Sequence, residues 1–397
     1  MTLLQELKKR KLFAAATHER EVEELLENEK VAIYVGFDAT ADSLHFGHLL
    51  QLINLKRVQD RGHTPILLVG GATTKIGDPS GKQDMRKMLT DEDIAHNIEC
   101  FKKQFAKFID LDKAIIVNNA DWIDELTISE FIRLGFNFNV SDMLRMDCYA
   151  TRRETGGLTL GEMCYLPMQS YDFMHLYKTH NCKIQMAGQD QWSNILGGVN
   201  LIRKTLGEKG NVFGLVTNLL LTSEGKKMGK TEKGAVWLDK NKFSTYDFYQ
   251  YFRNVPDEDV LNLLKMLTFI PLEKLKEYES YKNEQLNELK EILAFEMTKL
   301  VHSEEEAEEA REKAKSVFSG GDDAPIKKID MNEDTNILDF LVLSGLTPSK
   351  SEARRLVQQG GISIDNEKIG SLDYMVEKQR GEVLARKGKK VFVKIVF

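Results

Sequence analysis

The chain has 397 residues, enough for two or three domains, and its composition is that of an ordinary globular protein, 42% hydrophobic and 29% charged. A net charge of −6 argues against a wholly basic nucleic-acid coat. Because no apolar run approaches the ~20 residues of a membrane span and no signal peptide is visible, we expect a cytoplasmic protein with no membrane partner.

The four cysteines carry no pairing signal. Cys100, Cys148, Cys164 and Cys182 lie far apart, and no Cys-x-x-Cys occurs among them. Neither a disulfide framework nor a zinc site is indicated, so the sequence predicts inert thiols and no metal site.

The N-terminal segment leads into a strand, a loop and a helix. Residues 1–30 have a helical, amphipathic pattern, residues 31–35 are a short apolar run typical of a buried strand, and residues 49–58 carry apolar side chains at helical spacing. The loop between them holds His45, Gly47 and His48. Free N–H groups and the helix dipole both face such a loop, which favours an anion such as a nucleotide phosphate. The alternative is a chance string in a chain with eight His and 28 Gly.

A second apolar strand, residues 65–69, completes a β-α-β order. This order predicts a doubly wound parallel sheet whose ligands bind at the carboxyl ends of the strands. The following loop contains Thr73, Asp78 and Lys82, and Arg86 falls on the same helical face as Lys82 if a helix begins there. Two cations beside a phosphate site suggest a polyphosphate clamp; the alternative is a solvated basic turn.

Further along the chain, polar residues again follow predicted strands. The third strand, residues 114–117, ends near Asn119, and the fourth, residues 183–188, leads to Asp190 and Gln191. Between them Tyr165, Gln169 and Asp172 are spaced by four and three in an otherwise apolar helix, which places them on one face. That face indicates a pocket for a polar small molecule, unless it is a solvent-facing stripe.

The last part of the chain changes character. A glycine- and lysine-rich segment, residues 223–234, is typical of a mobile basic loop, and the pattern from Phe243 to Phe318 is helical and charged. A turn-rich linker follows, and the tail from Asn336 reads as two short helices followed by β-hairpins. The expected organisation is a catalytic domain at 1–220, the lysine loop with a helical domain at 221–318, a linker at 319–334 and a small domain at 335–397.

Together these motifs resemble a known family. A His-x-Gly-His loop after the first strand and a Lys-Met-Gly-Lys-Thr loop near residue 230 are similar to the two signatures of class I aminoacyl-tRNA synthetases. The strings from Tyr34 to His45, from Gly77 to Lys82 and from Gly188 to Trp192 resemble bacterial tyrosyl-tRNA synthetases specifically. The resemblance covers essentially the whole chain. It implies an α/β fold with a Rossmann-like catalytic domain, an α-helical anticodon-binding domain and a small α+β S4-like RNA-binding domain.

The resemblance also implies an activity and its residues. Tyrosine reacts with ATP to give tyrosyl-adenylate and pyrophosphate, and the tyrosyl group then moves to the 3′-terminal adenosine of tRNA(Tyr). Mg²⁺ accompanies ATP without a predicted protein ligand, and the enzyme is a homodimer. The implied tyrosine pocket consists of Tyr34, Thr73, Asp78, Asn119, Tyr165, Gln169, Asp172 and Gln191. The implied ATP-binding residues are Gly36, Asp38, Gly47, Gln185, Gly188 and Asp190, together with the catalytic group of Thr40, His45, His48, Lys82, Arg86, Lys227, Lys230 and Thr231. The implied tRNA contacts are Arg354, Arg355, Lys387, Lys389 and Lys390.

Within that pocket, Tyr34 and Asp172 would meet the substrate hydroxyl, while Asp78, Tyr165 and Gln169 would hold its ammonium group. Two departures from the family pattern stand out: Gly229 replaces a serine of the second signature, and Val35 replaces a cysteine near the ribose. Three other interpretations stay open. They are a tryptophanyl-tRNA synthetase, a small-molecule adenylyltransferase of the pantothenate synthetase kind, and a non-catalytic RNA-binding scaffold.

Overall fold

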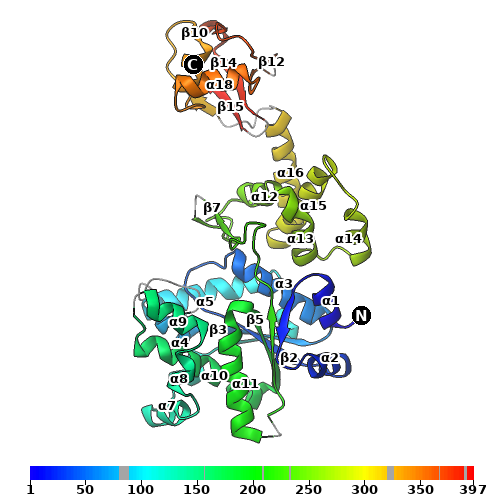
Figure 1. The fold of residues 1–397 in the computed structure, drawn as a ribbon, viewed down its shortest axis with the longest axis vertical. Coiled ribbons are helices and arrows are strands. Elements are labelled where there is room, and N and C mark those ends of the chain that lie inside the picture. Colours follow the sequence, from blue (N-terminus) through cyan, green and yellow to red (C-terminus); the bar gives the residue numbers. More distant parts are fainter. Residues whose placement is uncertain are drawn as a thin grey trace. The chain divides into compact units, whose positions relative to one another are not determined.

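The computed structural model describes residues 1–79, 89–155, 157–207, 210–231, 234–319, 326–365, 367–388 and 391–397. The chain divides into two compact units, Met1–Ser303 and Glu304–Phe397 (Figure 1). The predicted linker and domain limits do not coincide with this division and stay predictions.

A mixed six-stranded sheet forms the centre of the first unit. Its order is β1-β6-β5-β2-β3-β4, with β1 antiparallel to β6 and the other neighbours parallel. The predicted parallel strands are confirmed. The purely helical reading of residues 1–30 is wrong, because four of them form the edge strand β1. The strands are β1 (Phe13–Ala16), β2 (Ala32–Phe37), β3 (Thr64–Val69), β4 (Ile115–Asn118), β5 (Cys182–Gly188) and β6 (Phe213–Thr217).

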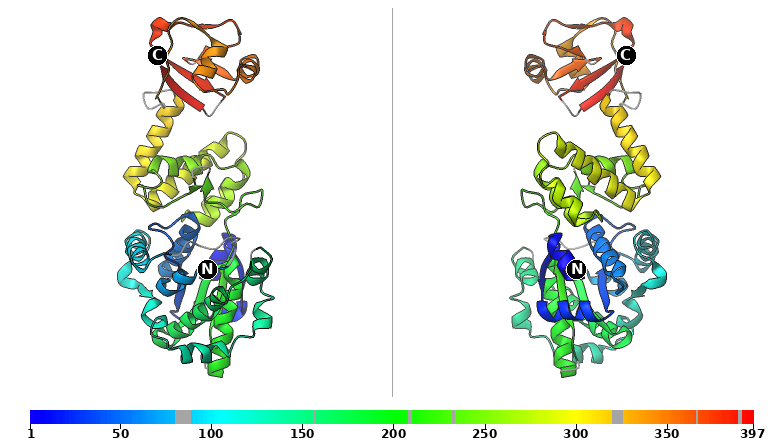
Figure 2. Two further views of the ribbon diagram at one scale, coloured as in Figure 1. Left: turned by 90° about the vertical axis from the view of Figure 1, so that its left-hand side faces the viewer. Right: turned by 90° about the vertical axis from the view of Figure 1, so that its right-hand side faces the viewer.

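Helices lie on both sides of this sheet (Figure 2). The helices of the first unit up to β6 are α1 (Leu3–Lys9), α2 (Glu19–Asn28), α3 (Phe46–Asp60), α4 (Gly71–Ile76), α5 (Asp91–Phe105), α6 (Ala120–Ile123), α7 (Ile128–Gly135), α8 (Val140–Met143), α9 (Asp147–Thr155), α10 (Leu160–His180) and α11 (Trp192–Leu206). Four further helices pack mainly on one another: α12 (Thr245–Arg253), α13 (Asp257–Leu267), α14 (Leu272–Tyr278) and α15 (Gln285–Val301). A β-hairpin, β7 (Lys230–Thr231) with β8 (Gly234–Ala235), precedes α12.

The strand order reverses between β2 and β5. From β2 the chain crosses through α3 to β3 on one side, and from β5 it crosses through α11 to β6 on the other. Right-handed crossovers place α3 and α11 on opposite faces, so a crevice opens at the carboxyl ends of β2 and β5. This is the position where an open α/β sheet binds ligands.

Local sequence explains the helix that borders this crevice, α10. Thr159 caps its start and forms a capping box with Glu162, and Asn181 ends it in the left-handed conformation with φ 50°. One turn inside, Tyr165 faces the crevice while Leu166 and Phe173 are buried in the core. The helix therefore presents polar side chains to the crevice on a rigid support.

A buried ion cluster ties α1 and α3 to the end of α13. Glu6 accepts hydrogen bonds from Arg10 at 2.8 Å, Arg57 at 3.0 Å and Arg61 at 2.5 Å. Arg10 also donates to carbonyl oxygens within residues 265–270, and Arg57 donates to the Thr268 carbonyl at 2.6 Å. Three guanidinium groups share one carboxylate, and the carbonyl oxygens accept from further N–H groups of Arg10 and Arg57, which offsets part of the cost of burying these charges.

The second unit packs two short helices against a sheet, as the sequence predicts. Its elements are α16 (Glu304–Ser319), β9 (Ile326–Lys328), β10 (Thr335–Asn336), α17 (Ile337–Leu343), α18 (Lys350–Gln358), β11 (Ile362–Ile364), β12 (Glu367–Lys368), β13 (Met375–Val376), β14 (Glu382–Lys387) and β15 (Val391–Val396). The larger sheet has the order β12-β11-β14-β15-β9. Strand β9 lies within the expected linker 319–334 and pairs in parallel with β15, so this part of the range belongs to the sheet.

Candidate active site

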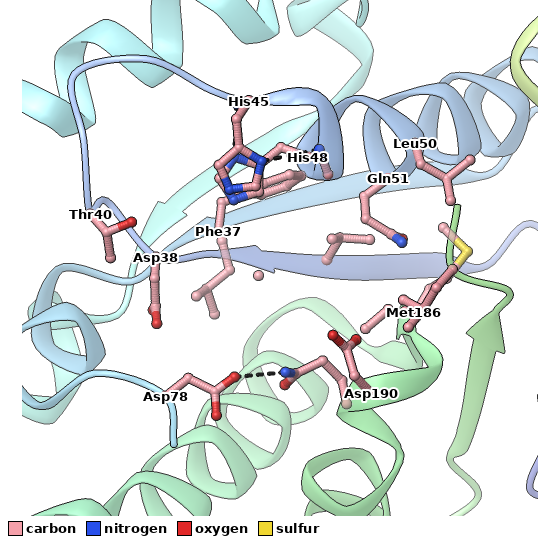
Figure 3. A pocket seen from close by; sticks show the side chains of 18 of the residues that line it. Phe37, Asp38, Thr40, His45, His48, Leu50, Gln51, Asp78, Met186 and Asp190 are labelled. Atoms are coloured by element: carbon pink, nitrogen blue, oxygen red, sulfur yellow. Dashed lines mark hydrogen bonds between the residues drawn. The ribbon is translucent and has the colours of Figure 1, made fainter. Parts of the chain in front are cut away.

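A cavity of about 470 Å³ occupies the crevice at the ends of β2 and β5 (Figure 3). His45 and His48 lie on one side of it, and Asp78 and Asp190 lie on the other. The site residues predicted from the sequence that line this cavity are Tyr34, Gly36, Asp38, Thr40, His45, Gly47, His48, Thr73, Asp78, Tyr165, Gln169, Asp172, Gln185, Gly188, Asp190, Gln191 and Lys227. The structure therefore brings together residues from five separate stretches of the chain.

Tyr34 and Asp172 form the buried end of the cavity. Tyr34 is 1% exposed, and its hydroxyl has no hydrogen-bond partner among the residues that the structure describes. Asp172 is 2% exposed and accepts from Asn119 Nδ2 at 3.0 Å and from Trp122 Nε1 at 2.8 Å. Burial raises the pKa of Asp172 to about 8, although the hydrogen bonds from the two donors act in the opposite direction. A ligand hydroxyl at this end would meet both a donor and an acceptor.

Two further carboxylates line the cavity away from this end. Asp78 Oδ2 accepts from Gln191 Nε2 at 2.7 Å, and Gln191 in turn accepts from Asn194 at 2.9 Å. Asp38 Oδ2 accepts from the Tyr165 hydroxyl at 2.9 Å. Negative charge at these positions suits a cationic group of a ligand.

Three glutamine side-chain oxygens of the cavity wall lack hydrogen-bond partners among the described residues, as the Tyr34 hydroxyl does. The Oε1 atoms of Gln169, Gln185 and Gln51 are buried and accept no hydrogen bond within the described ranges. Since buried acceptors are normally satisfied, these atoms mark positions where a ligand would donate.

The two histidines stand at the start of α3. His45 is its N-cap, and its Nδ1 accepts from the Gly47 N–H at 3.0 Å, while His48 Nδ1 accepts from the His45 N–H at 3.4 Å. Their rings stack with centroids 3.8 Å apart. Burial lowers the pKa of His45. This hydrogen bonding assigns the His45 proton to Nε2, so the neutral ring offers a donor to an anion.

Glycine is required between these histidines. A Cβ atom built on Gly47 would lie 2.9 Å from His45 Cε1, closer than real contacts allow. The backbone of this turn can therefore approach a ligand only without a side chain at this position.

The lysine loop borders the mouth of the cavity. Lys227 Nζ lies 3.0 Å from Asp190 Oδ2, and the Thr231 hydroxyl donates to the Gly234 carbonyl at 3.2 Å. Gly229 has φ +97°, its N–H donates to the Tyr251 hydroxyl at 3.0 Å, and a Cβ there would lie 2.9 Å from Phe46 Cβ. The second signature thus packs on the residue that follows His45.

Several predicted residues lie elsewhere. Asn119 is fully buried behind the cavity wall, and Thr231 is not part of the lining. Lys82 and Arg86 fall outside the described residues, as do Lys389 and Lys390, and of Lys230 only the backbone, in β7, is described. The polyphosphate clamp around residue 82 therefore stays a prediction.

Sequence reasoning missed Trp122 and Gln51. Trp122 lies in α6, three residues after Asn119 and just beyond the carboxyl end of β4. This nearness to the end of a predicted strand is the sequence signal that could have indicated a role beside Asp172. Gln51 lines the cavity from α3, and its Nε2 donates to Thr217 Oγ1 at 3.2 Å. It lies one turn after Gly47, on the face that carries His48.

Among the predicted tRNA contacts, Arg354 and Arg355 are exposed on α18. Lys387 instead donates to the Leu346 carbonyl at 2.9 Å and pairs with Glu352 at 3.0 Å. It therefore holds β14 to the helical side of the second unit.

The four cysteines are free thiols. Within the described ranges no group of three or more His, Cys, Asp or Glu side chains is placed to hold a metal ion. In those same ranges no helix has the length and apolar character of a membrane span.

Comparisons with known proteins agree with this geometry. The family described as tRNA synthetases class I (W and Y) matches residues 26–319, and the tyrosine–tRNA ligase SYY-like C-terminal domain matches residues 317–395. The tyrosine–tRNA ligase of Acetivibrio thermocellus is 48% identical over 406 residues, covering 99% of both chains. That of Clostridium kluyveri is 49% identical over 390 residues, covering 96% of this chain and 95% of the relative.

Among solved structures, a C-terminally truncated mitochondrial tyrosyl-tRNA synthetase from Aspergillus nidulans is similar in fold. Its TM-score is 0.70 at 28% identity, and the match covers 80% of this chain and 94% of that one. Full-length identity near one half, both family matches and the shared fold lead to one conclusion: the chain belongs to the tyrosine–tRNA ligases of the class I aminoacyl-tRNA synthetase family.

Proposed function

We propose that the chain activates L-tyrosine with ATP and transfers the tyrosyl group to the 3′-terminal adenosine of tRNA(Tyr), acting in the cytoplasm. The observation that carries this proposal is that Tyr34 and Asp172 both line the buried end of the cavity. A hydroxyl and a carboxylate, both buried, lie at the closed end of a cavity whose other end has a helix N-terminus built for an anion. Tyrosine and a nucleotide would fill these two ends together.

At the closed end, the substrate hydroxyl would donate to Asp172 and accept from Tyr34. Phenylalanine would leave the buried Tyr34 hydroxyl without a partner and would remove one donor from Asp172, which costs more than the lost contact alone. At the other end of the amino acid, Asp78 would balance the ammonium charge, with Tyr165 and Gln169 as acceptors. Gln191, which holds Asp78, completes this part of the pocket.

ATP would lie across the crevice between β2 and α3 on one side and β5 on the other. The ribose hydroxyls would be held by Asp190 beside Gly188, with Asp38, Gln185 and Gly36 near the nucleoside. The phosphates would lie over Gly47, with donors from Thr40, His45 and His48. Mg²⁺ would arrive bound to the phosphates as part of the substrate. Pyrophosphate would be gripped by Lys82, Arg86, Lys227, Lys230 and Thr231.

The chemistry then needs no nucleophilic side chain. A carboxylate oxygen of tyrosine attacks the α-phosphorus of ATP, the bond from that phosphorus to the bridging oxygen breaks, and pyrophosphate leaves with its electrons. A ribose hydroxyl of the terminal adenosine then attacks the tyrosyl carbonyl, loses its proton, and AMP departs. The protein contributes position and charge: the cavity aligns the reacting atoms, and the His45 Nε2–H and the lysine loop stabilise the charge that develops on the leaving phosphates.

The second unit offers a surface for tRNA, and the first unit offers a surface for a second copy of the chain. Arg354 and Arg355, exposed on α18, are suited to contact tRNA phosphates, which position the RNA without reading its sequence. Ile128, Ile132 and Phe136 follow one another at intervals of four and are 81%, 55% and 82% exposed. An apolar face of this kind supports a homodimer in which a second copy covers it.

Amino-acid-dependent ATP–pyrophosphate exchange, run with tyrosine, tryptophan and phenylalanine before any tRNA is added, tests the proposal. We expect exchange with tyrosine alone, followed by charging of tRNA(Tyr). Exchange with tryptophan, or with none of the three, would overturn it.

Sedimentation equilibrium of the full chain tests the dimer. Phe136→Glu should shift the protein to a monomer, and a wild-type monomer would contradict the proposed homodimer.

A further inference from the structure

The Thr73 hydroxyl joins two carboxylates that belong to different parts of the cavity. Thr73 lies on α4 and is 3% exposed. Its Oγ1 accepts from Asn119 Nδ2 at 3.1 Å and donates to Asp38 Oδ1 at 2.8 Å. A hydroxyl has a single proton, and Asn119 Nδ2 can only donate. The Thr73 proton is therefore committed to Asp38.

The orientation of Asn119 is fixed as well. Its Oδ1 accepts from the backbone N–H of Ala72 at 2.9 Å, which settles which end of the amide is oxygen. Both Nδ2 protons are then used, one on Thr73 and the other on Asp172 Oδ2 at 3.0 Å. Asn119 thus connects the carboxylate at the closed end of the cavity to Thr73.

On the far side of Thr73 the chain of hydrogen bonds continues to Tyr165. Asp38 Oδ2 accepts from the Tyr165 hydroxyl at 2.9 Å, so the Tyr165 proton points at Asp38. The Tyr165 oxygen can then offer only lone pairs to the cavity. A substrate ammonium group, which is purely a donor, fits such an acceptor.

Close packing holds Thr73 and Asp38 in this arrangement. A Cβ atom built on Gly70 would lie 2.3 Å from both Asp38 Oδ1 and Thr73 Oγ1, so the two side chains rest against the Gly70 backbone. Their contact is thus enclosed by backbone as well as by hydrogen bonds, and it lies at the end of β3 on the cavity floor.

We propose that Thr73 is a positioning residue that couples recognition of the two ends of tyrosine: through Asn119 it orients Asp172 for the substrate hydroxyl, and through Asp38 it fixes Tyr165 as an acceptor for the ammonium group. The inference rests on the function proposed above and changes the expected role of Thr73 from contacting tyrosine to acting through its neighbours. It follows from the direction of each hydrogen bond in the chain from Asp172 to Tyr165.

The variants are Thr73→Val, which keeps the shape but removes the hydroxyl, and Thr73→Ser, which keeps the hydroxyl. Thr74→Val is the matched control, because Thr74 is the next residue of α4 and is also buried. Its hydroxyl accepts from the Ala39 N–H at 2.8 Å, outside the chain of hydrogen bonds. Thr73→Ala serves as a second deletion of the hydroxyl should the valine variant fail to fold.

Pyrophosphate exchange gives KM for tyrosine, and its inhibition gives Ki for two analogues. Phenylalanine lacks the hydroxyl, and 3-(4-hydroxyphenyl)propanoate lacks the ammonium group. We expect Thr73→Val to raise KM for tyrosine about tenfold and to reduce the preference for tyrosine over both analogues. The reason is that the hydroxyl and the ammonium group of tyrosine, each absent from one analogue, then contribute less to binding. Thr73→Ser should restore both preferences, and Thr74→Val should change neither.

Two results would overturn the coupling, provided that the wild type exchanges with tyrosine. In one, Thr73→Val or Thr73→Ala leaves both preferences unchanged. In the other, the variant loses only one of the two preferences. A merely structural role would lower thermal stability or total activity and leave the two ratios intact. Absence of tyrosine-dependent exchange in the wild type would overturn the proposed function and this inference together. Failure of the inference alone would appear as normal exchange in the wild type with unchanged preferences in the Thr73 variants.

Discussion

Lys227 and Asp190 form an ion pair at the mouth of the active-site cavity, with Nζ 3.0 Å from Oδ2. The Lys227 side chain is 57% exposed and that of Asp190 34%, so the pair is weak and easily exchanged. Asp190 is also the carboxylate proposed to hold the ribose. If Asp190 holds the ribose as proposed, we expect ATP to displace Lys227 from Asp190, which would release the lysine charge near the phosphates.

Replacing Lys227 by methionine separates these two effects. We expect adenosine, which has no phosphates, to inhibit exchange at the same or up to about fivefold lower concentration, because it no longer displaces a lysine. The adenylation rate constant should fall by about 10²–10³-fold, since a charge that stabilises the transition state is missing. Adenosine inhibition and single-turnover adenylation measure the two quantities.

Lys226→Met is the control for this experiment, because Lys226 belongs to the same loop but pairs with Glu224 at 2.8 Å. It should leave adenosine inhibition and the adenylation rate nearly unchanged. Weaker inhibition by adenosine in Lys227→Met would contradict the exchange of partners at Asp190.

Gly229→Ala should slow adenylation and leave tyrosine affinity unchanged. At φ +97° any side chain is strained, at a cost of about 1–3 kcal/mol, and here the new Cβ would also meet Phe46. Gly225→Ala is a matched control, since Gly225 lies in the same loop at φ +78° with open space around it. Stopped-flow adenylation should show a clearly larger loss for Gly229→Ala; equal losses would mean that contact with Phe46 is irrelevant.

Trp122→Phe removes the indole donor of Asp172 and keeps an aromatic ring in place. Leaving a buried acceptor without its donor costs about 1–3 kcal/mol, so we expect KM for tyrosine to rise roughly 5- to 150-fold and the preference over phenylalanine to shrink. His175→Leu is the control, because His175 stacks on Trp122 at 4.3 Å without donating to Asp172. If both variants lose the same preference, ring packing rather than the N–H is responsible.

The pKa of His45 predicts a pH dependence with a definite sign. Burial lowers this pKa below the ordinary 6.5. As pH falls, His45 therefore takes up its proton in the unfolded chain before it does so in the folded protein. The free energy of unfolding then decreases from about pH 6.5 downward. Between pH 7.5 and 5, thermal unfolding should show a larger loss for the wild type than for His45→Asn, which keeps an N-cap side chain. Nitrogen-15 NMR of the ring should find a neutral imidazole protonated at Nε2 at pH 6.5; a half-protonated ring there would refute the assignment.

Much of the site was predictable because its signals are local. The spacing of Tyr165, Gln169 and Asp172 predicts one helical face, and α10 presents all three to the cavity. The β-α-β order likewise predicts parallel strands with polar residues at their carboxyl ends, which is where Asp38 and Asp190 lie.

What escaped prediction depends on contacts distant in the sequence. Phe13–Ala16 has no alternation of its own and becomes strand β1 only by pairing with β6, some two hundred residues later. Ile326–Lys328 is similarly short and joins its sheet only through β15. The direction of the Thr73 proton follows from Asn119 and Asp38, and no spacing rule connects those three residues.

The ion cluster around Glu6 has a consequence for how the protein is made. Arg10 binds carbonyl oxygens 255 to 260 residues further along the chain, and Arg57 binds one 211 residues further along. At roughly 5–20 residues per second, a ribosome needs about 13–50 seconds to synthesise the longest of these separations. During that interval Glu6 is already present, and water must take the place of the missing carbonyl oxygens. The N-terminal helix therefore gains its last hydrogen bonds only after α13 has emerged, so a nascent chain shorter than about 270 residues lacks this brace.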